Sequence, residues 1–153
     1  MVEVKFLLTK KDSEMATLLE KTPHVTRAIW AKKCAERVLP YFELKFPKDD
    51  RPGIALHTLQ AWIDTGKFSM AVIRKASLDS HAAARAVGED SPARSAARAC
   101  GQAVATAHVA THAYGGAIYA QQAIFRATNS MEEVTKERDW QYEYLQELVA
   151  KIV

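Results

Sequence analysis

Two histidines stand four residues apart in the segment "VATAHVATHAYGGA", which spans residues 104–117. On a continuous α-helix, His108 and His112 would lie on one face, and many zinc sites use this spacing. A zinc site needs further protein ligands, and this segment contains no carboxylate. The third ligand would have to come from elsewhere in the chain, where the candidates are Asp49, Asp50, Glu36, His57 and His81.

The histidine pair is open to three interpretations: a metal site, a catalytic pair, or polar residues where a helix meets another helix or a partner protein. No HExxH-type carboxylate lies between the two imidazoles. On a continuous helix, Arg94 and Arg98 would lie in the same longitudinal strip, and two guanidinium groups favour an anion over a divalent cation. We therefore favour a packing or docking role without a metal, and we keep the metal site as the alternative.

A second candidate is Cys34 in "WAKKCAERVLPYFE", residues 30–43. A thiol can act as a nucleophile when a histidine from another part of the fold lies beside it. Trp30, Cys34, Val38 and Phe42 recur every four residues, however, which is typical of the buried face of a helix. We favour a buried thiol, with Glu36 and Arg37 in ion pairs.

A third candidate is the aspartate pair in "KDDRP", residues 48–52. Paired carboxylates can bind a metal ion or transfer protons. These aspartates come directly before a predicted helix, where a carboxylate at Asp50 would accept hydrogen bonds from backbone amides. We favour this capping role for Asp50, and we expect Arg51 to form an ion pair with a carboxylate of the preceding helix.

Helix start and stop signals predict an all-α fold, a compact bundle of about six helices. Pro40 should interrupt the second of these helices, Gly66 should end the third, and Ser69, Ser91 and Ser130 should cap the helices that follow them. Residues 2–8 form either a strand or an arm that leads into the first helix. The predicted helices span residues 12–21, 22–46, 50–66, 69–88, 91–131 and 130–152.

The stretch from Ser91 to Met131 contains no Asp, Glu or Lys, and alanine is its commonest residue. Such a helix has little reason to face water, and its small side chains allow neighbouring backbones to approach closely. We predict that it forms the centre of the bundle, as one helix or as a pair of helices broken at Gly115–Gly116.

The composition is that of a soluble globular domain, with 153 residues, 48% hydrophobic residues and a net charge of +3. This charge is too small to indicate nucleic-acid binding, and no apolar stretch is long enough to cross a membrane. The start of the chain lacks the features of a signal peptide, and Cys34 and Cys100 suit a reduced compartment. We expect a cytoplasmic protein without a cofactor.

Four segments stand out in the chain: "WAKKCAERVLPYFE", "PKDDRPGIALHTLQAWIDTGK", "ARSAARACGQAVATAHVATHAYGGAIYA" and "ERDWQYEYL". In order and spacing they resemble the putative immunity proteins of bacterial polymorphic toxin systems, in the fifth-class-like group. The resemblance extends from Ala28 to Leu145 and divides the chain into an N-terminal arm and short helix (1–22) and a single all-α immunity-protein-like domain (23–153).

The resemblance implies an inhibitor that binds and neutralises a cognate toxin and catalyses no reaction itself. The alternative function is a small helical metal-dependent hydrolase, which would use His108 and His112 with carboxylates near Asp50. A homodimer is a further possibility, because a second copy could cover an apolar helix face. The candidate binding residues, which match the family's motifs and could instead be architectural, are Trp30, Cys34, Arg37, Asp50, Arg51, His108 and His112.

Overall fold

The computed structural model describes residues 3–152, and within them it contains eight α-helices and no β-strand. The predicted all-α class is therefore confirmed. The helices are α1 (Lys10–Glu20), α2 (His24–Glu36), α3 (Pro40–Glu43), α4 (Arg51–Thr65), α5 (Met70–Ala86), α6 (Pro92–Ala105), α7 (His112–Thr128) and α8 (Met131–Ala150).

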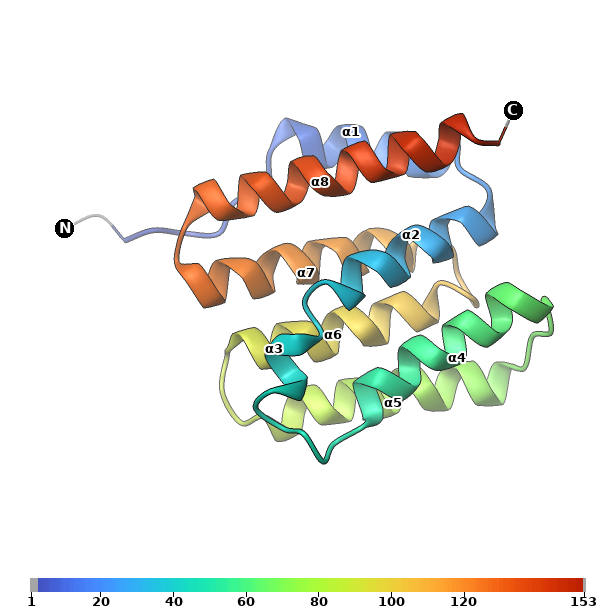
Figure 1. The fold of residues 1–153 in the computed structure, drawn as a ribbon, viewed down its shortest axis with the longest axis horizontal. Coiled ribbons are helices and arrows are strands. Elements are labelled where there is room, and N and C mark those ends of the chain that lie inside the picture. The colour runs from blue at the N-terminus through green and yellow to red at the C-terminus, as the bar shows by residue number, and fades with distance from the viewer. Residues whose placement is uncertain (1–2, 153) are drawn as a thin grey trace.

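The helices form a layered bundle. Figure 1 shows α1 and α8 along one edge of the molecule and α4 and α5 along the opposite edge, with α2, α6 and α7 between them. Helix α6 contacts α2, α3, α4, α5 and α7. Its buried residues are almost all small, as in Ala93, Ser95, Ala99 and Gly101, so its neighbours approach its backbone closely. None of the described helices has both the length and the apolarity that crossing a bilayer requires.

Local signals place most helix ends where the sequence predicts them. Ser69, Ser91 and Ser130 each accept a hydrogen bond from the backbone amide three residues later, which satisfies one free donor of the helix start. Gly66 ends α4 in the left-handed conformation, with a φ of 68°. Pro40 separates α2 from α3 because proline lacks an amide hydrogen and fits only the first turn of a helix.

The buried face predicted for the second helix is confirmed. Trp30, Cys34 and Val38 are 0% exposed and Phe42 is 1% exposed, although the helix itself is split between α2 and α3. Residues 3–9 form neither a helix nor a strand and lead as an arm into α1. The strand alternative therefore does not hold for these residues, and Val2 lies outside the described part of the chain.

The acid-free stretch is broken at residues 106–111, before Gly115–Gly116. Amides of Thr106 and Ala107 bond to carbonyls three residues earlier, which tightens and ends α6. The two glycines lie inside α7 instead. A Cβ atom on Gly116 would lie 3.5 Å from the carbonyl oxygen of Ala99, an ordinary van der Waals contact that shows how closely α7 packs on α6. Consequently, the predicted break at Gly115–Gly116 is wrong.

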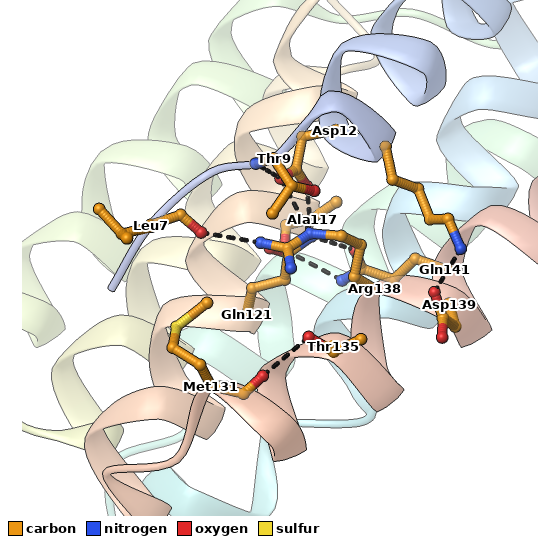
Figure 2. Close-up of polar contacts among 11 residues, drawn as sticks. Leu7, Thr9, Asp12, Ala117, Gln121, Met131, Thr135, Arg138, Asp139 and Gln141 are labelled. Atoms are coloured by element: carbon orange, nitrogen blue, oxygen red, sulfur yellow. Dashed lines mark hydrogen bonds and ion pairs between the residues drawn. The ribbon is translucent and has the colours of Figure 1, made fainter. Parts of the chain in front are cut away.

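A buried polar network joins α1, α7 and α8, as Figure 2 shows. The guanidinium Nε of Arg138 lies 2.8 Å from Asp12 Oδ2 in an ion pair whose side chains are 2% and 1% exposed. Arg138 Nη2 donates to Gln121 Oε1 and to the carbonyl oxygen of Leu7, both at 3.0 Å. Gln121 Nε2 donates to Asp12 Oδ1 at 3.0 Å and to Gln141 Oε1 at 2.8 Å. The network therefore holds the N-terminal arm against the bundle.

Candidate functional site

A pocket of about 330 Å³ lies between α5 and the junction of α6 with α7. The side of the pocket formed by α5 combines apolar residues with the polar Ser77 and His81 and with one cation, Arg74. The side formed by α6, the turn and the start of α7 contributes polar side chains, including the two histidines singled out in the sequence. The lining residues are Met70, Ile73, Arg74, Ser77, Leu78, His81, Gln102, Ala105, His108 and His112.

His81 is fixed in a neutral form on one wall of the pocket. Its Nδ1 lies 3.0 Å from Arg98 Nη1, and because a guanidinium can only donate, Nδ1 accepts and Nε2 carries the proton. Burial and the charge of Arg98 lower the pKa of His81 to about 4. A Cβ atom on Gly101 would lie only 2.7 Å from His81 Nε2, so the ring can lie against α6 only because residue 101 is glycine.

His112 and His108 occupy different positions from those a continuous helix would give them. His112 is the first residue of α7, and its Nδ1 donates to Gln102 Oε1 at 2.8 Å. Burial lowers the pKa of His112. His108 is an exposed residue of the turn before α7, and its ring centroid lies 6.1 Å from that of Phe68. The break after α6 therefore separates the two histidines, but both still line the same pocket.

The pocket has a mixed polar and apolar lining, with a positive charge at its edge. Arg74 is the only charged residue that lines it, and no Asp or Glu is among its described lining residues. The adjacent Lys75 pairs with Asp79, whereas the Arg74 side chain forms no hydrogen bond or ion pair with the residues that the structure describes. Large apolar side chains remain exposed around the opening, including Met70 at 43%, Leu78 at 54% and the neighbouring Phe68 at 46%.

The structure does not bring the histidines together with the aspartates. Asp50 and Arg51 line a separate pocket, formed by residues 45–51 at the start of α4. Among the described residues, no group of three or more His, Cys, Asp or Glu side chains is arranged to hold a metal ion. The hydrolase alternative needs His108, His112 and carboxylates near Asp50 in one site, and this geometry does not provide such a site.

The capping role predicted for Asp50 is wrong, because its side chain forms no capping hydrogen bond. The neighbouring Asp49 accepts from the Arg51 amide at 3.2 Å and from the Arg51 guanidinium at 2.9 and 2.7 Å. The Arg51 side chain thereby lowers the pKa of Asp49. Arg51, the first residue of α4, is thus paired with the residue two positions before it and not with the preceding helix, and Asp50 is left exposed.

The α2 candidates lie against α8. Trp30 Nε1 donates to the carbonyl oxygen of Gln141 at 2.8 Å, and Trp30 and Cys34 are both 0% exposed. Burial raises the pKa of the Cys34 thiol well above its ordinary value, which keeps it protonated and unreactive. Neither side chain can contact a partner while the chain is folded. Both instead form part of the core.

Arg37 is exposed and forms a specific contact with α8. Its Nε and Nη2 each donate to a different carboxylate oxygen of Glu137 at 2.8 Å. Its guanidinium carbon lies 3.8 Å from the centroid of the Trp140 ring. The ion pair expected for Arg37 is present, and Glu36 pairs with Lys32 at 3.0 Å.

Sequence reasoning missed the part of the pocket that α5 provides. From the sequence, His81 is a candidate only as a third metal ligand, and Arg74 is not a candidate at all. The one local signal is Gly101, a residue smaller than alanine on a helix otherwise rich in alanine, which indicates that a neighbouring group lies very close to the backbone.

A family model described as Imm-5 like putative immunity protein matches residues 17–148. The match covers most of the chain and includes the whole range in which the sequence resembles immunity proteins. It begins within α1 and ends within α8, so it includes the pocket and the α2–α8 contacts. No curated protein and no solved structure matches the chain.

Proposed function

We propose, because the chain belongs to the Imm-5 like putative immunity protein family, that it binds a cognate toxin and neutralises it without catalysing a reaction. The single observation that carries this proposal is the family match over residues 17–148. In the same proposal, the toxin belongs to a bacterial polymorphic toxin system, the chain falls in the fifth-class-like group, and inhibition takes place in the cytoplasm.

The geometry supports inhibition by surface contact. The fold is a closely packed helical bundle that can present a preformed surface, so little ordering entropy would be lost on binding. The described residues provide no activated thiol, because burial raises the pKa of both Cys34 and Cys100. Of the sequence-predicted binding residues, Arg37, Asp50, Arg51, His108 and His112 remain available at the surface, at three separate places.

The test is a titration of the toxin domain encoded beside this gene with the purified chain. An inhibitor that acts by binding should abolish toxin activity at about one equivalent, and an enzyme should do so far below one equivalent. Co-expression should restore growth to cells that produce the toxin. Absence of both effects would contradict the proposal.

Two further measurements address the alternatives. Elemental analysis of untagged protein is expected to find no stoichiometric metal. A metal that is present in stoichiometric amount, and lost in a His108→Ala/His112→Ala variant, would favour the hydrolase instead. Sedimentation of the chain alone, and of its mixture with the toxin, determines whether a homodimer exists and whether the toxin displaces it.

A further inference from the structure

We propose that the pocket between α5 and the α6–α7 junction receives a toxin segment that presents a carboxylate beside an apolar side chain. This inference rests on the proposed function and specifies the surface and the chemistry of the partner. It concerns residues of α5, chiefly Arg74 and Leu78, that the sequence motifs did not single out.

The first argument is charge complementarity. Arg74 is exposed at the edge of the pocket, has no ion-pair partner among the described residues, and faces no lining carboxylate. Arg98 adds a second positive charge behind His81. A guanidinium binds a carboxylate through paired hydrogen bonds, which are roughly twice as strong as neutral ones. An acidic side chain of the partner would therefore satisfy the one charge that the pocket leaves unpaired.

The second argument is the exposed apolar surface. Met70, Leu78 and Phe68 are between 43% and 54% exposed, and they lie together around the opening instead of being scattered singly. Clustered apolar surface beside a polar rim marks binding sites. The volume of about 330 Å³ is at the lower end of the range for ligand pockets, about 300–1,000 Å³, and suits one or two side chains of a protein.

The polar side chains of the lining can orient a bound partner group without adding charge to the pocket. His81 is held by Arg98, His112 by Gln102, and the Ser77 hydroxyl donates to the carbonyl oxygen of Gly101. These groups are fixed before any partner arrives, so binding would cost little side-chain entropy. A phosphate backbone suits the pocket less well, because nucleic-acid sites cluster several cations and this lining has one.

Helix α5 offers two matched pairs of substitutions for the test. Arg74→Glu and Lys75→Glu make the same change in net charge at adjacent positions, but only Arg74 lines the pocket. Leu78→Asp and Val72→Asp introduce the same residue at two side chains that are each 54% exposed, and only Leu78 lines the pocket. All four residues are exposed, so the variants should fold, and circular dichroism would verify this.

The experiment measures binding of each variant to the toxin domain encoded beside this gene. Arg74→Glu and Leu78→Asp should weaken binding by at least about tenfold, and Lys75→Glu and Val72→Asp should change it by less than about threefold. Equal effects within each pair would overturn the pocket assignment and leave the proposed function intact. If the pocket variants change only self-association of the chain, a second copy occupies the pocket and the inference is likewise wrong. If the wild-type chain neither binds nor protects, the proposed function fails, and this inference fails with it.

Discussion

Loss of the Asp12 carboxylate should destabilise the protein far more than loss of its exposed neighbour. Two ion pairs link α1 to α8: Lys11 lies 2.6 Å from Asp139, and Asp12 lies 2.8 Å from Arg138. The exposed pair is the shorter, so distance alone would rank it as the stronger. Burial reverses the order, because Lys11 and Asp139 are each 42% exposed and Asp12 and Arg138 at most 2%.

The expected loss of unfolding free energy depends on whether the remaining charged side chain of each pair is buried or in contact with water. In Asp12→Asn, the Arg138 guanidinium stays buried without a counterion, which should cost about 3–5 kcal/mol of unfolding free energy. In Lys11→Ala, Asp139 remains in contact with water, and the expected cost is about 0.2–1 kcal/mol. With a urea m-value of about 2 kcal/mol per molar, the Asp12→Asn midpoint should fall by about 2 M.

Urea unfolding monitored by circular dichroism would measure both variants, and a double-mutant cycle would isolate the coupling. Asp12→Leu combined with Arg138→Met removes both charges, so its loss should be smaller than the sum of the two single losses. The reasoning would be refuted if Asp12→Asn and Lys11→Ala had indistinguishable midpoints. Additive single losses would show that the two charges do not interact.

Three further predictions concern residues around α6. The pKa of His81 is about 4 in the folded chain and 6.5 in the unfolded chain, so the unfolded chain binds more protons between these values. Stability should therefore fall as the pH drops from 6.5 to 4, by about 1–2 kcal/mol after allowance for partial exposure, and His81→Gln should flatten this slope in urea titrations. Gly101→Ala should lower the free energy of unfolding by about 1–3 kcal/mol, because the new Cβ atom would overlap the His81 ring. Gly53→Ala is the control: its Cβ atom would lie 3.7 Å from the nearest atom of another residue, so the substitution should raise the free energy of unfolding by about 0.5 kcal/mol. A chromogenic thiol reagent should modify Cys34 and Cys100 only at the rate at which the chain opens, because both are 0% exposed; rapid modification in native buffer would contradict their burial.

Much of the fold follows from local signals that act within a few residues. A serine hydroxyl that accepts a hydrogen bond from the amide three residues later stabilises the start of a helix, and Ser69, Ser91 and Ser130 do so. The spacing from Trp30 to Phe42 likewise identifies a buried face. The break at residues 106–111 has no comparable signal, because no glycine, proline, asparagine or aspartate occurs within it. Within it, the buried Thr106 has its carbonyl oxygen hydrogen-bonded to the ring of His24, a residue distant in the sequence.

The pocket could be predicted only in part, because its two walls are distant in the sequence. The histidine pair marks the wall at the start of α7, but its partners on α5, Arg74 and His81, carry no motif of their own. Nothing in the sequence indicates that the His81 ring accepts a hydrogen bond from Arg98 on the neighbouring helix, because that contact depends on how closely α5 packs on α6. The Asp50 error has a similar origin: either aspartate before α4 could cap the helix, and the hydrogen bonds of Arg51 favour Asp49.

The composition of the central helices accounts both for their burial in the core and for the positive charge of the pocket. Between Ser91 and Met131 the chain has no acidic residue, so neither α6 nor α7 can place a carboxylate beside a cation from a neighbouring helix. Small residues let α5 lie close to α6, where the His81 ring occupies the space over Gly101. The pocket lies beyond this contact, where α6 ends and the chain turns toward α7. No acidic side chain lies opposite Arg74 in the described lining. The same absence of acids that allows the helices to be buried therefore leaves the pocket positive.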